Sequence, residues 1–179
     1  MKSSLGKRIQ QGHSISFRLT SIFGLGKAPV APGTVATLVA GIPCFLAVGH
    51  FPWQIQLTFA GAVYLIGWVL SEKTERELGR TDPKEVVIDE LCGYLVAMTG
   101  HPVSFASILT GFLLFRLFDI WKPWPIRSVE SKLTGGTAIM LDDVLAGIYA
   151  NVLGLIVLKL VGLWNQSLTQ PTVFKNRTN

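Results

Sequence analysis

Long apolar stretches alternate with short polar ones along this chain. Residues 28–71 contain no Asp, Glu, Lys or Arg, and this run is broken only by a turn-like segment at 50–52. The pattern repeats over 91–115, around a second turn at 100–102, and a fifth apolar segment covers 144–163 with a single lysine. Such segments are typical of membrane-crossing helices. We therefore predict an all-α, multi-helical integral membrane protein with about four to five apolar helices.

Composition favours the same class. The chain has 179 residues, of which 49% are hydrophobic and 15% charged, and its mean hydropathy is +0.44. This length suits one domain, which we place at residues 19–165, between a basic tail (1–18) and a polar tail (166–179). Several segments are shorter than the roughly 20 residues of a perpendicular span, so some helices are expected to be short or tilted. Five core helices of a soluble protein are the alternative.

The charges predict how the helices are oriented. Counting turns places the starts of the first, third and fifth helices on one side, where Lys and Arg concentrate, whereas the opposite turns carry neither. The basic side of a membrane protein faces the cytoplasm. The chain has a net charge of +5, and its basic residues border the apolar spans. We therefore predict anionic lipid headgroups, and no nucleic acid, as partners.

Gly93, Gly147 and Gly154 permit close helix packing within one chain or in a homo-oligomer. Residues 72–85 are predicted to form a short surface helix followed by a turn.

Three acidic clusters fall on the predicted cytoplasmic side: Asp89-Glu90, Asp119 and Asp142-Asp143. Carboxylates from separate segments suit a magnesium ion, which also binds phosphate. The alternative is that each acid caps a helix or balances a base. Adjacent residues on a helix point about 100° apart, so one acid of each pair is expected to face elsewhere. We assign Asp89, Asp119 and Asp143 as ligands, direct or through water, with Glu90 or Asp142 as a base or supporting residue.

Basic residues accompany the middle cluster. Arg116, Lys122 and Arg127 surround Asp119 and are candidate phosphate partners. An Arg116–Asp119 ion pair at a proline-terminated helix end would explain the same residues without catalysis. Before the first apolar helix, a glycine-rich segment ends in Thr34, which we predict to cap a helix N-terminus directed at an anion.

The positions of the histidines and of Cys92 argue against several kinds of nucleophile. His13, His50 and His101 lie in the tail or in the opposite turns, which argues against a histidine nucleophile. Cys92 is not followed by an arginine at the spacing of a cysteine phosphatase loop, which argues against a cysteine nucleophile. No aspartate pair has the DxDx(T/V) form of haloacid-dehalogenase-type phosphatases, which argues against that aspartyl mechanism. Hydrolysis of a phosphate by metal-bound water remains, and an aspartyl-phosphate route stays open. A lipid phosphotransferase is a second hypothesis. A transporter or ion-binding protein is a third, and it predicts acids spread through the depth of the membrane.

Four segments, GLGKAPVAPGT, VVIDELCG, FRLFDIWKPWPIR and GGTAIMLDDVLAGI, resemble the phosphatidylglycerophosphatase A family over about residues 22–150. The resemblance implies a magnesium-dependent phosphatase of the bacterial inner membrane, with its active site facing the cytoplasm. Its phospholipid substrate would be phosphatidylglycerophosphate, and its products phosphatidylglycerol and inorganic phosphate. Lys27 departs from the family pattern. The site residues implied by matching motifs are Thr34, Asp89, Glu90, Asp119, Lys122, Asp142 and Asp143, with Asp89, Glu90, Asp119 and Asp143 as metal ligands.

Overall fold

The described part of the chain is entirely helical, which confirms the all-α prediction. The computed structural model describes residues 14–169, with side chains described as far as residue 162, so most of the two predicted tails lies outside the described residues. The α-helices are α2 (Ile15–Thr20), α3 (Pro32–Ala36), α4 (Ile42–Val48), α5 (Trp53–Leu78), α6 (Ile88–Met98), α7 (Phe105–Trp121), α8 (Ile126–Lys132) and α9 (Gly135–Thr169). A 3-10 helix, η1 (Leu25–Lys27), precedes α3, and a π-helical segment, η2 (Thr37–Gly41), joins α3 to α4.

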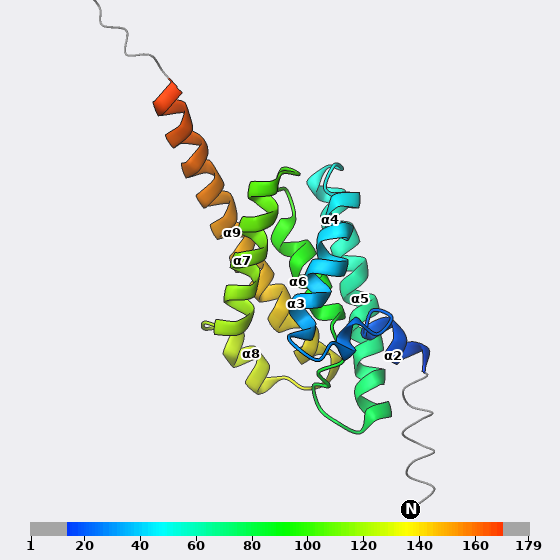
Figure 1. The fold of residues 1–179 in the computed structure, drawn as a ribbon. Helices are drawn as coiled ribbons and strands as arrows, with labels where there is room; N and C mark the ends of the chain where they lie inside the picture. Colours follow the sequence, from blue (N-terminus) through cyan, green and yellow to red (C-terminus); the bar gives the residue numbers. More distant parts are fainter. Residues whose placement is uncertain (1–13, 170–179) are drawn as a thin grey trace, which may run out of the picture.

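The apolar segments form a bundle of helices that run side by side. The segments α3, η2 and α4 follow one another as a single rod, and this rod, α5, α6, α7 and α9 make up the bundle (Figure 1). Helix α5 has 26 residues, and the part of α9 over Gly135–Gly162 has 28, so both are long and apolar enough to cross a membrane. The remaining apolar helices are shorter, as the sequence indicated.

The outer surface of the bundle is apolar. Leu65 on α5, Leu113 on α7 and Leu160 on α9 are each more than half exposed, as are further large apolar side chains on the same helices. A surface like this is unfavourable in water over so large an area but has no comparable cost against lipid tails. The exposed faces therefore agree with the two long helices in indicating membrane association.

Helix α6 occupies the centre of the bundle and lies very close to α9. A Cβ added at Gly93 of α6 would lie 2.6 Å from the carbonyl oxygen of Asp143, and one at Gly147 of α9 would overlap the carbonyl oxygen of Gly93. These glycines thus serve close packing within the chain. The contact places the start of α6 directly beside Asp143.

Two amide side chains, the buried Gln56 and the partly buried Asn151, close the end of the bundle away from the start of α6. Gln56 donates from Nε2 to the carbonyl oxygens of Gly49 (3.2 Å) and Phe51 (2.8 Å), and its Oε1 accepts from the Gly100 N–H (3.0 Å). Asn151 donates to the Thr99 carbonyl oxygen at 2.7 Å. These bonds satisfy backbone groups where the chain reverses between α4 and α5 and between α6 and α7.

Three local predictions were wrong. Helix α5 continues to Leu78 and ends at Gly79, which has φ 63°, so no separate surface helix starts at residue 72. Helix α9 begins at Gly135, well before the predicted start at residue 144, and the Glu72 Oε2 atom accepts its Gly136 N–H at 2.7 Å. The residue before α3 is Ala31, and Thr34 lies inside the helix instead of capping it.

Candidate active site

A pocket of about 400 Å³ opens at the end of the bundle where α6 begins and α7 ends. Its walls come from the starts of α3 and α6, the last turn of α7, the first turns of α9 and the loops that precede α6 and α9. All three predicted acidic clusters line it, although they lie far apart in the sequence. The charged side chains in its wall are Glu75, Asp82, Lys84, Asp89, Glu90, Arg116, Asp119, Lys122, Glu130, Asp142 and Asp143.

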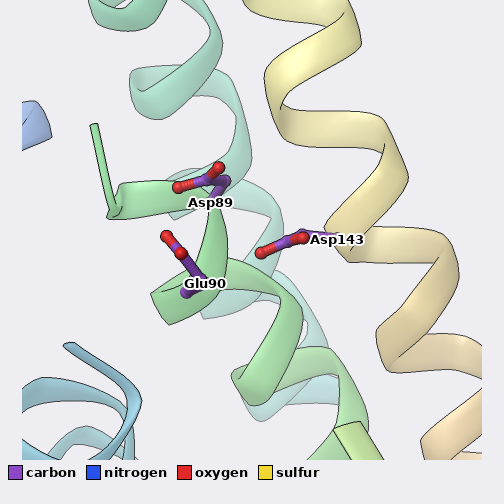
Figure 2. Close-up of side chains that lie close together, drawn as sticks. All are labelled: Asp89, Glu90 and Asp143. Atoms are coloured by element: carbon purple, nitrogen blue, oxygen red, sulfur yellow. The ribbon is translucent and has the colours of Figure 1, made fainter. Parts of the chain in front are cut away.

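Three carboxylates converge in the pocket. Asp89, Glu90 and Asp143 each offer one oxygen, and these oxygens lie within 4.8 Å of one another. Figure 2 shows Asp143 reaching from α9 toward the two acids at the start of α6. Among the described residues, Asp89 Oδ1, Glu90 Oε2 and Asp143 Oδ2 are buried without a hydrogen-bond partner. Buried carboxylate oxygens without partners are costly, and a hard cation is the ligand that would satisfy them, so this cluster could bind a metal.

The expectation that neighbouring acids diverge holds for one pair only. Asp142 and Asp143 face different partners, as their positions about 100° apart on α9 require. Asp89 and Glu90 nevertheless bring one oxygen each to the same place. Their helical positions differ by the same angle, but the longer glutamate side chain can bend back toward its neighbour.

Asp119 is held beside the three acids by an arginine. Its Oδ2 lies 2.8 Å from Arg116 Nη1, one turn earlier on α7, and both side chains are largely buried. The Asp119 carboxylate is close enough to Glu90 and Asp143 to interact with both electrostatically. Among the described residues, Arg116 Nε has no hydrogen-bond partner, so this guanidinium retains donors for a ligand.

Lys122 is fixed in place at the pocket wall. It ends α7 with a left-handed backbone (φ 45°), and its Nζ lies 2.8 Å from Asp142 Oδ2 and 2.8 Å from Glu130 Oε1. Burial alone would lower the pKa of Lys122, but the two hydrogen-bonded carboxylates outweigh burial and raise this pKa above its usual value. The ammonium therefore stays charged at neutral pH and serves as a fixed cation.

Gly33 leaves room for Glu90. The start of α3 passes so close to α6 that a Cβ at Gly33 would overlap Glu90 Oε1 and lie 2.8 Å from its carboxyl carbon. This glycine therefore lets the backbone of α3 approach a candidate metal ligand closely.

Not every predicted residue reaches the pocket. Thr34 and Arg127 are absent from its lining, and Arg127 is exposed. Sequence reasoning missed Lys84, which lines the mouth, and Glu72, which holds the start of α9. Glu72 had a signal, since it is the first acid after a long uncharged run. Lys84 had none, because a lysine in a polar turn usually points into water.

The fold and pocket define a class: a membrane-associated protein whose acidic, cation-edged pocket could bind a metal. Comparison with known proteins makes this specific. The phosphatidylglycerophosphatase A family model matches residues 18–158. The chain is 35% identical to phosphatidylglycerophosphatase A of Escherichia coli over 70% of this chain and 73% of that protein. It is 40% identical to phosphatidylglycerophosphatase A of Haemophilus influenzae over 72% of this chain and 79% of that protein.

The chain belongs to the phosphatidylglycerophosphatase A family and is a phosphoric monoester hydrolase. A third relative, from Bacteroides thetaiotaomicron, carries the name "Putative phosphatidylinositol-3-phosphatase". The chain is 35% identical to it over 73% of this chain and 86% of that protein. No solved structure matches the chain.

Proposed function

We propose that the pocket hydrolyses the terminal phosphate of phosphatidylglycerophosphate, with magnesium as cofactor, and releases phosphatidylglycerol and inorganic phosphate. The observation that carries this proposal is the convergence of Asp89, Glu90 and Asp143, with their three buried oxygens lacking partners, beside Arg116 and Lys122. Anionic and cationic groups in one pocket suit a metal ion together with a phosphate. We infer the identity of the lipid headgroup from the family match.

The donor set fits magnesium. Asp89, Glu90 and Asp143 would hold the ion through carboxylate oxygens, with Asp119 close enough to take part through water. When bound, the ion supplies neutralisation of phosphate charge and a water of lowered pKa. Among residues 14–162, whose side chains are described, no histidine or cysteine lines the pocket. The chain's own part is therefore to hold the phosphate, orient it and neutralise its charge.

Two cations of the chain are placed for that task. Arg116 is oriented by Asp119, and its Nε–H has no hydrogen-bond partner within the described part of the chain, so it can bind phosphate oxygens directly. Lys122 is held by Asp142 and Glu130 and adds a positive charge that does not titrate near neutral pH. Thr34 and Arg127 are left out of the proposed set because neither lines the pocket.

Asp142 acts through its neighbours. One of its oxygens binds Lys122, and the other accepts the Asp143 N–H at 3.0 Å. It thereby connects the cation to the backbone that carries a proposed metal ligand. We assign Asp142 to positioning, and Glu90 or Asp119 to holding the attacking water.

The proposed setting is a bacterial cytoplasmic membrane with the pocket facing the cytoplasm. The acids gather at one end of the bundle, with most of the described lysines and arginines, and this supports the positive-inside orientation. The same clustering argues against a transport path, which would distribute acids through the depth of the membrane.

The test is release of inorganic phosphate from phosphatidylglycerophosphate by the purified protein in detergent, with magnesium or with chelator. We expect magnesium-dependent release that Asp143→Asn lowers about a hundredfold or more. Glu77→Gln is the matched control, because Glu77 is an acid on α5 that bonds Ser14 at 2.6 Å and lies outside the pocket wall. Phosphatidylinositol 3-phosphate is the comparison substrate that the third relative indicates. A folded wild type that releases no phosphate, or an Asp143→Asn variant with the wild-type rate, contradicts the proposal.

A further inference from the structure

A second pocket adjoins the proposed active site. It has a volume of about 480 Å³ and lies between the loop around η1 and the turn before α6. It shares Ala31, Pro32 and Lys84 with the wall of the acidic pocket. Its charged lining residues are Lys27, Lys84 and Glu85. We call it the lysine pocket, and its shared wall places it next to the proposed active site.

The negative charge in the lysine pocket is already neutralised. Glu85 receives two hydrogen bonds from Arg80 Nη2, at 3.0 and 3.1 Å. This pairing outweighs the partial burial of Glu85 and lowers the pKa of its carboxyl. In the part of the chain that the structure describes, Lys27 and Lys84 form no ion pair. Lys27 interacts electrostatically with Glu85 but does not form an ion pair with it. Two cations therefore face a pocket whose Glu85 carboxylate is bound to Arg80, and such a pocket is a site for an anion.

The loop that carries Lys27 has a defined position. Gly26 is pressed against the turn before α6, where a Cβ would overlap the Glu85 carbonyl oxygen. The Lys27 Nζ lies 5.1 Å from the centre of the Phe17 ring, a cation–π distance. The position of Lys27 near the pocket is thus set by packing at both ends of the residue.

The outside of this loop indicates which kind of anion reaches it. Phe23 and Val30, on either side of Lys27, are 83% and 76% exposed. Large apolar side chains next to a lysine are typical of a segment at the lipid headgroup level, where the apolar groups enter the membrane and the ammonium meets phosphate. The anion is therefore expected to be part of a membrane lipid.

We propose that Lys27 and Lys84 bind the phosphodiester of the lipid substrate while its terminal phosphate occupies the acidic pocket. This inference rests on the proposed function. Phosphatidylglycerophosphate carries two phosphates joined by one glycerol, and the two adjoining pockets offer one cationic site for each. The lysine pocket would then select lipids that have a diester in addition to a monoester phosphate.

The experiment compares two substrates with the same acyl chains. Phosphatidylglycerophosphate has both phosphates, whereas phosphatidic acid has only the monoester. For the Lys27→Gln/Lys84→Gln double variant, we expect KM for phosphatidylglycerophosphate to rise about tenfold. Because Lys84 also lines the acidic pocket, we expect KM for phosphatidic acid to rise as well, but by no more than about threefold. Lys73→Gln is the matched control, because Lys73 is a lysine of α5 that lines neither the lysine pocket nor the acidic pocket. Lys27→Arg/Lys84→Arg should restore a low KM.

A second measurement does not depend on catalysis. Short-chain phosphatidylglycerol carries the diester alone, and its binding by calorimetry should weaken about tenfold in the double variant. An unchanged KM for phosphatidylglycerophosphate, or an equal rise for both substrates, would overturn the inference. A wild type inactive on phosphatidylglycerophosphate would instead overturn the proposed function. In that case unchanged phosphatidylglycerol binding by the double variant would also refute the lysine pocket.

Discussion

Replacing Gly33 with alanine adds one methyl group at the closest approach of α3 to the acidic cluster. The new Cβ would lie 2.8 Å from the carboxyl carbon of Glu90, whereas an ordinary contact begins at 3.4 Å, and it would overlap Oε1. The carboxyl carbon must therefore retreat by at least 0.6 Å, and the oxygen by more than about 1 Å, from the place where three carboxylates meet.

The expected cost falls on catalysis and spares stability. Gly33 has an ordinary helical backbone, so alanine gains about 1 kcal/mol of helix propensity. Turning the Glu90 side chain away costs about 0.5–1.5 kcal/mol, which roughly cancels that gain. Displacing a catalytic group by about 1 Å can lower the rate roughly a hundredfold. We expect kcat to fall about ten- to a hundredfold, with an increased magnesium requirement and a melting temperature within a few degrees of wild type.

The assay is phosphate release over a magnesium titration, paired with thermal unfolding in the same detergent. Gly61→Ala is the control, because a Cβ at Gly61 of α5 meets nothing within 4 Å. Glu90→Ala removes the Cγ, carboxyl carbon and oxygens that the new methyl group would meet. The Gly33→Ala/Glu90→Ala double variant should therefore be no less active than Glu90→Ala alone. A Gly33→Ala variant with wild-type activity and magnesium requirement, or strictly additive losses in the double variant, would refute this account of Glu90.

Further predictions concern the neighbouring acids and the α6–α9 contact. Asp142→Asn should keep more of the magnesium affinity than Asp143→Asn, because Asp142 binds Lys122 and the Asp143 N–H while Asp143 faces the cluster; equal losses in a magnesium titration would contradict these separate roles. Gly147→Ala should lower the unfolding free energy by about 1–3 kcal/mol, because its Cβ would overlap backbone of Gly93, whereas Gly162→Ala meets nothing. Thermal unfolding that shows no difference between the two variants would be evidence against close α6–α9 packing.

Much of the fold could be predicted because it follows from apolar runs and their interruptions. The turns at 50–52 and 100–102 separate helices in the structure, and the apolar segments between them are helical. The start of α9 could not be placed, because its N-terminus is stabilised by Glu72, which is distant in the sequence. The continuation of α5 to Leu78 was missed because a charged stretch was taken as a new element, although polar residues extend a helix readily at its exposed end.

The site was predictable in its residue types and less so in its pairings. Sequence position showed that the acids belong to one end of the bundle, and the motifs named the family. Which acids converge depends on side-chain bending, as with Glu90, and on partners from other helices, as with Lys122 and Asp142. The Arg116–Asp119 ion pair that the alternative explanation predicted is present, and both residues also line the pocket. The same pair can therefore stabilise the end of α7 and take part in the site.

The division of the acidic cluster between α6 and α9 has a consequence for biosynthesis. During translation, Asp89 and Glu90 are made before Asp143, because α7 and α8 lie between α6 and α9 in the sequence. Until α9 packs against α6, the nascent chain lacks the third carboxylate of the cluster, Asp143, and also the Lys122–Asp142 ion pair. A prematurely terminated chain would therefore lack the proposed site, and the appearance of phosphatase activity during translation in the presence of vesicles would report when α9 packs against α6.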